Sequence, residues 1–418
     1  MKLNKWTLGL AAVGVVSLAS LAQAEEKNAV QTALSSTTIS GYVDTSAQWN
    51  FGTGNANLPP YKFGGGGKAD GFNLNVVQLS IQKPLDESEW AAGYKVDLWM
   101  GPDAKTLGTA SYIGLLGQAS DFAIRQAYVA LRAPVGNGID FKMGVFDTIV
   151  GYESVESGNN PNMTRSYGHS IEPQTHTGLL ATYRFCDAFS VAVGVADTIG
   201  PSINARSHYS PYPVGIPGIG SVQLPLGGDH AESYKTYMGS LALTAPQDWG
   251  WLAGSTLYGG VVNGLNSPGL MGLGYVQTSW YAGATLATPV TGLKLGAAFD
   301  YMNAEDSSND RVPDKWAVAG YASFQATEKL SLHARGEWYQ IQEPYPNDNS
   351  QIFAATATIQ YDLWQNVISR LEFRWDHDAG GDKSFGGRAE VSDGMFGESN
   401  RPTRENAFML AANIIYKF

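Results

Sequence analysis

Hydrophobic and polar positions alternate along much of this chain, and the final stretch, 405–418, shows what that pattern requires. One face carries Phe408, Leu410, Ala412, Ile414, Tyr416 and Phe418. The other face carries Ala407, Met409, Ala411, Asn413, Ile415 and Lys417. An apolar strand that ends on an aromatic residue exposes an edge that soluble domains avoid, whereas a closed barrel in lipid has no open edge. The stretch predicts the closing strand of a transmembrane barrel, with the last strand of a soluble β-sandwich as the alternative.

Similar stretches recur along the chain, and counting them predicts sixteen strands, to within about two. An even number is what single-chain bacterial barrels require. They are 37–50, 72–83, 90–100, 121–132, 139–146, 175–185, 188–198, 234–245, 252–262, 275–288, 291–302, 315–327, 329–340, 350–361, 363–376 and 405–418. The gaps alternate between short turns and long loops. The long ones are 51–71, 101–120, 147–174, 199–233, 263–274, 303–314, 341–349 and 377–404. This alternation is typical of an antiparallel up-and-down β-barrel with short periplasmic turns and long external loops.

Aromatic residues gather at both ends of the predicted strands. Near the short turns lie Trp90, Trp249, Trp251, Trp364, Tyr416 and Phe418. Near the long loops lie Trp49, Trp99, Trp316, Trp338 and Trp375. Two bands of amphipathic rings are what the two interfaces of a bilayer favour, although tryptophan also borders strands in soluble proteins. The bands support a barrel that spans a membrane.

Charged residues on several strands occupy one face only. A charge on the lipid face at mid-membrane costs about 2–4 kcal/mol, so these rows must face the lumen. The predicted pore-lining residues are Lys95, Asp97, Lys142, Arg184, Lys294, Asp300, Arg335, Glu337, Arg370, Glu372 and Arg374. The stretch 121–132 is ambiguous, because Arg125 and Arg132 lie on opposite parities. The rows either set up a field across the lumen or form cross-strand ion pairs that support the wall.

The start of the chain has the features of a secretory signal. Lys2 and Lys5 precede an apolar stretch, and Ala22-Gln23-Ala24 forms a small-x-small cleavage site. We therefore expect a signal peptide over 1–24, a short periplasmic segment over 25–36 and a barrel over 37–418. A membrane anchor is the alternative, but the apolar stretch is short for one.

Composition narrows the function further. The formal net charge is −11, which argues against nucleic acid as a partner. The single cysteine, Cys186, allows no disulfide framework within the chain. The oxygen-rich stretches 303–310 and 346–350 lack the spacing of a calcium loop, so we expect no cofactor, with divalent cations at acidic external loops as a weak alternative. The nearest approach to a catalytic group is Asp376-His377-Asp378, but no motif joins a nucleophile, a base and an orienting group, so we expect no enzyme.

Three passages resemble one family. They are Ser40-Gly41-Tyr42-Val43-Asp44-Thr45-Ser46, the strand from Phe72 to Pro84, and the run from Gly151 through Arg165-Ser166-Tyr167 to Gly178. Together they resemble the OmpL-like family of β-barrel porins over essentially the whole mature chain. The resemblance implies a location in the outer membrane of a Gram-negative bacterium and no catalytic residues. It also implies that the terminal aromatic, Phe418 with Tyr416 beside it, is read by the barrel assembly machinery.

The resemblance also suggests a role for the loop 147–174. In general porins the third external loop folds into the barrel and narrows it, and by position this is the third long loop. Its candidates for the pore constriction are Glu153, Glu156, Arg165 and Glu172. A Gly-rich polar segment suits a wet pore, because its backbone groups can be hydrated there. The alternative is a surface loop outside the barrel mouth.

We predict an outer-membrane porin whose water-filled channel passes small hydrophilic solutes and ions by diffusion. At about sixteen strands a barrel is too wide for wall side chains to fill. The expected partners are outer-membrane lipids, lipopolysaccharide, the solutes themselves and, as in general porins, further copies in a homotrimer. The alternatives are a surface adhesion or structural barrel, whose long loop 199–233 binds a partner, and a channel specific for a sugar or peptide.

Overall fold

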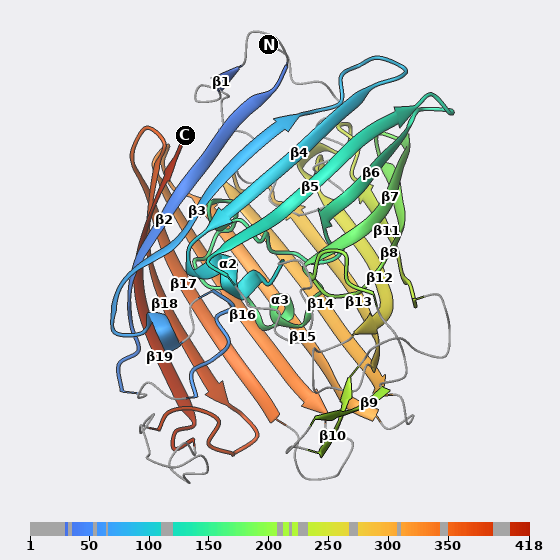
Figure 1. The fold of residues 1–418 in the computed structure, drawn as a ribbon. Coiled ribbons are helices and arrows are strands. Elements are labelled where there is room, and N and C mark those ends of the chain that lie inside the picture. Colours follow the sequence, from blue (N-terminus) through green and yellow to red (C-terminus); the bar gives the residue numbers. More distant parts are fainter. Residues whose placement is uncertain are drawn as a thin grey trace.

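The computed structural model describes residues 30–31, 36–52, 57–63, 66–109, 120–206, 212–216, 220–224, 233–266, 275–306, 311–342, 350–387 and 402–418. They form a closed antiparallel up-and-down barrel of sixteen strands, which confirms the predicted fold class (Figure 1). The barrel strands are β2 (Thr38–Trp49), β3 (Gly71–Lys83), β4 (Ala92–Met100), β5 (Phe122–Ala133), β6 (Ile139–Asp147), β7 (Thr175–Cys186), β8 (Phe189–Ala196), β11 (Thr236–Thr244), β12 (Thr256–Asn266), β13 (Tyr275–Ala287), β14 (Leu293–Asp306), β15 (Arg311–Gln325), β16 (Leu330–Gln342), β17 (Ser350–Trp364), β18 (Val367–Asp378) and β19 (Asn406–Lys417).

Smaller elements lie outside the barrel sheet or in its loops. β1 (Val30–Gln31) pairs with the start of β2, and β9 (Tyr212–Ile216) forms a hairpin with β10 (Gly220–Leu224). The helices are α2 (Pro102–Leu107) and α3 (Tyr167–Ile171), with short 3₁₀ turns η1 (Gly66–Lys68), η3 (Ser157–Asn159) and η4 (Gly250–Leu252). No helix in these described ranges is long and apolar enough to cross a membrane. The predicted signal peptide lies outside them.

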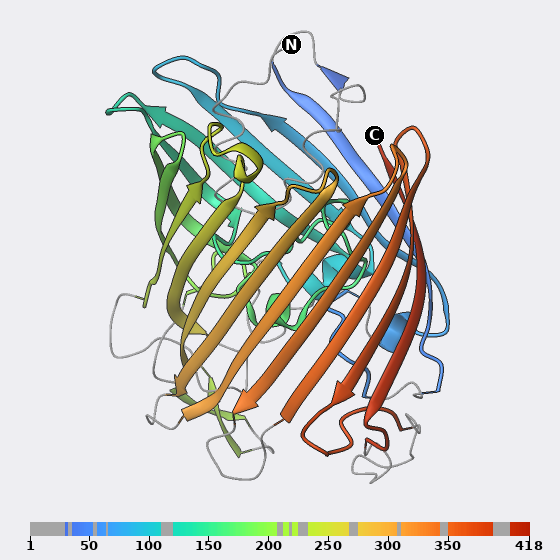
Figure 2. The same ribbon diagram turned by 180° about the vertical axis from the view of Figure 1, so that it is seen from behind.

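The start of β2, the end of β19 and the short turns lie at one end of the barrel, and the described parts of the long loops lie at the other (Figure 1). The wall is uneven at the long-loop end. β4, β6, β8 and β11 have 9, 9, 8 and 9 residues, whereas β13 to β17 have 13 to 15. The long strands are seen in Figure 2, and α2 and α3 are visible below the ends of the short ones in Figure 1. The barrel therefore has a low side, formed by β4 to β11, and a high side, formed by β13 to β17.

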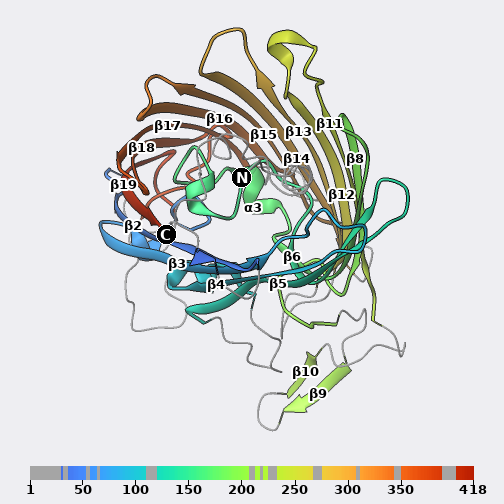
Figure 3. The same cartoon turned by 90° about the horizontal axis from the view of Figure 1, so that it is seen from above.

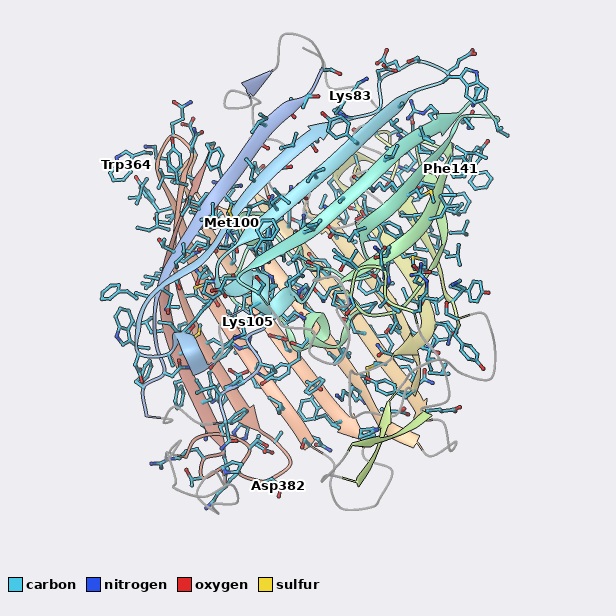
Figure 4. All side chains as sticks on the ribbon, in the orientation of Figure 1. Lys83, Met100, Lys105, Phe141, Trp364 and Asp382 are labelled. Carbon is cyan, nitrogen blue, oxygen red and sulfur yellow. The ribbon has the colours of Figure 1, made fainter. Side chains whose placement is uncertain are left out.

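Alternation along the strands separates a lipid face from an interior. Trp364 and Phe141 point away from the barrel near the short-turn end (Figure 4). Trp90, Trp249 and Trp364 are more than half exposed at or beside the short turns, where one aromatic band is predicted. The prediction that Trp99 belongs to the other aromatic band is wrong. Trp99 faces inward and is fully buried, and its indole Nε1 donates to Gln78 Oε1 at 2.6 Å.

The seam between β19 and β2 closes the barrel as the alternating pattern predicts. Tyr416 lies opposite Val43, and Lys417 lies opposite Tyr42. The Phe418 and Gly41 backbones exchange two hydrogen bonds of 2.8 and 2.9 Å. A Cβ at Gly41 would collide with the Gln78 carbonyl oxygen and would meet the Phe418 ring. Glycine at this position therefore leaves the space that the terminal aromatic ring occupies.

A β-bulge resolves the ambiguous stretch on β5. Gln126 pairs with Asp97 and Ile124 pairs with Leu98, so Arg125 is the extra residue. A bulge lets two successive side chains share one face and reverses the parity beyond it. Arg125 and Arg132 are accordingly both buried on the inner face, at 2 and 6% exposure. Simple alternation failed here because period two assumes an unbroken ladder.

Candidate functional site

The loop between β6 and β7, residues 148–174, lies inside the barrel. Figure 3, seen from above, places α3 within the ring of strands. α3 contacts β14, β15 and β16 on the far wall, and its Ser166 side chain caps it by accepting from the His169 amide. The structure thus favours an inward loop over the surface loop that the sequence left open.

Arg335 on β16 joins the loop to the high side of the wall. It donates to Glu153 of the loop at 2.9 Å and to Glu337 beside it at 2.6 Å. It also donates to the Thr164 carbonyl at 2.8 Å. All of these side chains are almost wholly buried. Charged pairs of this kind hold firmly only when every polar group is satisfied, and here the loop backbone supplies the missing acceptors.

Neighbouring charges on the same wall bind the loop backbone directly. Glu372 accepts from the Thr164 amide at 2.9 Å and from its hydroxyl at 2.6 Å, and Glu337 accepts from the Tyr167 amide at 2.7 Å. Arg370 donates to the Asn160 carbonyl at 2.8 Å, and Arg374 donates to the Arg165 carbonyl at 2.7 Å. The charged rows predicted to line a pore therefore face inward but lie beneath the loop.

On the opposite wall, the bulged Arg125 binds Glu156 in the first half of the loop. Its guanidinium lies 2.6 Å from Asp97, 2.6 Å from Asp147 and 3.2 Å from Glu156. Lys95 lies 3.2 Å from Asp97 and remains partly exposed at 22%. The sequence left Arg125 out of the candidate residues because only the bulge places it inside.

Arg165, predicted to face the opening, instead braces the loop from within. Its guanidinium donates to the carbonyls of Ser154, Met163 and Val155, each at 2.9 Å. It also lies over the Phe63 ring at 5.6 Å. Because these carbonyls belong to the two halves of the loop, Arg165 holds the loop as one folded unit.

Glu172 lies near the end of the loop, beside the Asp300 carboxyl of β14. Burial, together with the neighbouring Asp300 carboxyl, raises the pKa of Glu172 well above its ordinary value. Burial lowers the pKa of His169 well below its ordinary value, and its Nδ1 lies 3.3 Å from Glu172 Oε2. A neutral imidazole and two close carboxyl groups favour a protonated Glu172 in the docked loop.

Docking of the loop should therefore weaken as pH rises. A raised pKa gives stability that is complete below the ordinary value of 4.5 and is lost as pH passes through the raised value. We expect Glu172→Gln, which mimics the protonated acid, to unfold at the wild-type temperature in acid and at a higher temperature than wild type in alkali. Gel mobility after stepwise heating in detergent measures this. Asp382→Asn, at an exposed loop position, should follow wild type throughout; a constant gap between wild type and Glu172→Gln would contradict the assignment.

The remaining predicted residues lie near the short-turn end. Lys142 lies over the Tyr128 ring at 5.1 Å, and Lys294 is exposed. Arg184 faces the lumen by parity but folds onto its own turn, 2.9 Å from Asp187. With Lys95 and Lys417, these residues belong to the part of the interior where inward side chains remain accessible to solvent.

Two further segments enter the barrel from the long-loop end, and the sequence did not predict either. In the first, Tyr61 is 1% exposed and packs with Met409, Ala411, Leu58 and Met163. In the second, α2 buries Ala104 and Leu107 in a cluster with Trp99. At mid-height, the inward side chains of the described parts of β14 to β19 are buried beneath the loop and these segments. Pro59 and Pro60 before Tyr61 were the available signal, but nothing in the pattern gave their direction.

Residues 36–418 match the family model described as "Putative beta-barrel porin-2, OmpL-like". The chain belongs to this family. It is an outer-membrane β-barrel porin, a channel for passive diffusion, and the resemblance carried by the three sequence passages is confirmed. A search of curated proteins finds no match.

Solved structures with the fold of this OmpL-like porin include the anion-selective porin from Comamonas acidovorans. It is 12% identical, with a TM-score of 0.57, and the match covers 91% of this chain and 99% of that one. The outer membrane channel DcaP of Acinetobacter baumannii is 9% identical, with a TM-score of 0.57 and coverage of 93 and 99%. OmpF of Salmonella typhi, in complex with daunomycin, is 13% identical, with a TM-score of 0.52 and coverage of 91 and 97%. At these identities the likeness concerns the fold.

The acid–histidine stretch at the rim of the porin does not assemble as a catalytic group. Asp376 faces inward and is bound by Arg374, whose Nη2 lies at 2.8 Å, and by the Tyr167 hydroxyl at 2.9 Å. His377 lies on the other face, beside the Trp375 ring, and bonds to Asn406 at 3.0 Å. Strand alternation thus separates the two groups, and the family and fold are those of channels rather than enzymes.

Proposed function

We propose that this porin conducts small hydrophilic solutes and ions by diffusion, and that residues 148–174 narrow its lumen. The observation that carries the proposal is the position of this loop, which crosses the interior and is held to both walls by Arg335 and Arg125. A loop tied at several points restricts the passage without requiring energy coupling. Its partly exposed edge, which includes Glu156 and Asn159, faces the solvent-accessible part of the lumen.

A single cysteine on this edge tests the proposal. In a Cys186→Ser background, which removes the exposed native thiol, Asn159→Cys should form conducting channels in a planar bilayer. Addition of a bulky, charged methanethiosulfonate reagent should then reduce the current by at least about half, since the modified side chain obstructs the passage. Asp382→Cys, at an exposed loop position, should react without changing the current. Unchanged current after complete modification of the thiol introduced by Asn159→Cys would refute the constriction.

We further propose how the porin is processed, assembled and surrounded in the membrane. Cleavage after Ala24, recognition of Phe418 by the assembly machinery and contact with lipopolysaccharide all suit an outer-membrane barrel. A solved relative, OmpT of Vibrio cholerae, is described in a trimer form, and we propose a homotrimer here. The acidic stretches 303–310 and 346–350 lie mostly outside the described residues and stay weak candidates for divalent cations.

A surface-binding barrel is the second candidate. The observation that favours it is the β9–β10 hairpin, which stands at the long-loop end of the barrel (Figure 1). A folded protein that is silent in the bilayer assay would support this alternative. Conductance that one sugar or peptide blocks would instead support a solute-specific channel.

A further inference from the structure

Tyr61 lies at one end of a stack of side chains across the interior. The Arg374 guanidinium lies 5.0 Å from the Tyr61 ring and 5.2 Å from the Tyr167 ring. Tyr167 in turn stacks on Tyr339, with ring centroids 4.8 Å apart. Tyr61 is the member of this stack that comes from an external loop other than 148–174. The stack therefore joins a wall strand, the main inward loop and a second loop.

The main loop cannot leave the lumen without unpairing buried charges. Glu153 would lose Arg335, and the Glu372, Arg370 and Arg374 side chains would lose their bonds to the loop backbone. Removing one partner from a buried pair is strongly unfavourable, because the other charge stays desolvated. The 148–174 loop is consequently a fixed part of the barrel interior.

The Tyr61 side chain is held by weak contacts, whereas the rest of its loop also carries charged ones, with Lys62 near Glu172 and Lys68 paired with Asp103. The Tyr61 hydroxyl accepts from the Asn50 amide at 3.1 Å, and the Pro60 carbonyl accepts from Ser170 at 3.4 Å. Neutral hydrogen bonds each contribute little, and a cation–π contact adds a modest amount. The Tyr61 ring is therefore easier to displace than the 148–174 loop, while Lys62 and Lys68 keep the rest of its own loop in place.

Displacement of Tyr61 leaves the wall intact. Arg374 makes its hydrogen bonds in the plane of its guanidinium, to Asp376 at 2.8 Å and to the Arg165 carbonyl at 2.7 Å. Tyr61 covers only one face of that plane, and Tyr167 still covers the other. Departure of the ring would uncover Met409 and Ala411 on β19 and open space beside the fixed loop.

We propose that Tyr61 is the gate of the channel and that the cation–π contact of its ring with Arg374 determines how readily solutes pass. The proposal rests on the conduction proposed above. In the seated state Tyr61 fills the gap between the fixed loop and the β19 wall. In the displaced state the gap is open while the network of buried charges stays paired.

Single-channel recording in planar bilayers tests the gate. Tyr61→Ala should raise the mean conductance at least twofold, whereas Tyr61→Phe, which keeps the ring on Arg374, should stay near wild type. Tyr237→Ala, which removes a tyrosine from the lipid face, is the matched control and should not change conductance. Heat-modified gel mobility must show that each variant is folded.

Cross-linking tests the same gate from the closed side. In the Cys186→Ser background, Tyr61→Cys with Met409→Cys places thiols on two side chains of one packed cluster. A cleavable bifunctional thiol reagent should lower conductance, and cleavage of its linker should restore it. Wild-type conductance in Tyr61→Ala, or no effect of the cross-link, would overturn the gate alone. A folded Tyr61→Ala that is silent beside a conducting wild type would also overturn the gate alone, and silence of both folded proteins would overturn the gate and the conduction together.

Discussion

Arg335→Met is expected to lower the stability of the porin by about 3–5 kcal/mol, because it leaves buried acids without their cation. Glu153 and Glu337 are both within 2.9 Å of the Arg335 guanidinium and are almost wholly buried. Methionine fills the volume of the stem but donates no hydrogen bond to the Thr164 carbonyl or to either acid. The temperature at which the folded band disappears from a detergent gel measures the loss.

A second effect of Arg335→Met should appear in conduction. With its bond to β16 lost, the loop should fluctuate, and single-channel current noise should increase. Lys294→Met is the matched control, since Lys294 is exposed and the described part of the chain gives it no ion pair. Adding Glu153→Gln and Glu337→Gln to Arg335→Met should recover part of the stability, because no unpaired charge remains. An unfolding temperature equal to that of wild type would refute the role of Arg335.

Gly41→Val is expected to prevent most of the protein molecules from closing into a barrel. A Cβ at Gly41 collides with the backbone oxygen of Gln78 and meets the Phe418 ring, so both strands beside β2 must shift. The two backbone hydrogen bonds between Gly41 and Phe418 would be lost as well, each contributing about 0.5–1.5 kcal/mol. The yield of heat-modifiable protein after refolding into detergent should fall at least about tenfold, which corresponds to about 1.4 kcal/mol.

Gly336→Val provides the matched control for the seam. Gly336 also lies on the outer face of its strand, but a Cβ there would meet nothing within 4 Å. It should refold at the wild-type yield. Refolding into detergent involves no assembly machinery, so the yield of the valine variants reports the geometry of the seam alone. Deletion of Phe418 would not make this distinction, because it removes both the seam contacts and the proposed assembly signal. Equal yields for the two valine variants would show that the seam tolerates a side chain at Gly41.

Period-two alternation predicted the barrel well because each strand has one face in lipid and one in the interior. The closing strand follows that rule throughout, with Ala407, Met409 and Ile415 buried inward and Ile414 and Tyr416 exposed on the outer face. Alternation failed at Arg125, where a bulge inserts a residue. Trp99 was misplaced for another reason: its position near a long loop put it in the aromatic band, although it shares the parity of Lys95 and Asp97 and packs with α2. A local pattern cannot reveal the bulge, since it depends on pairing with the neighbouring strand, whereas strand parity alone would have turned Trp99 inward.

The interior was less predictable than the wall. The sequence identified the charged residues of β16 and β18 and the acids of the loop, but it could not show that they bind one another. Glu372 and Arg370 interact with backbone groups about two hundred positions away, and backbone groups carry no sequence signature. The inward position of Tyr61 was not predicted for a similar reason, since its partner Arg374 lies far along the chain.

The uneven wall has a consequence for the surrounding lipid. The 8 residues of β8, at about 3.3 Å each and a tilt of about 45°, span about 19 Å of membrane, whereas the 15 residues of β17 span about 35 Å. The apolar band of such barrels is about 25 Å tall. Lipid must thin beside β8 but not beside β17, and such hydrophobic mismatch has a modest free-energy cost that favours tilt or association. Contact of β8 with another protein surface would remove this cost, so hydrophobic mismatch favours association at the side of the short strands.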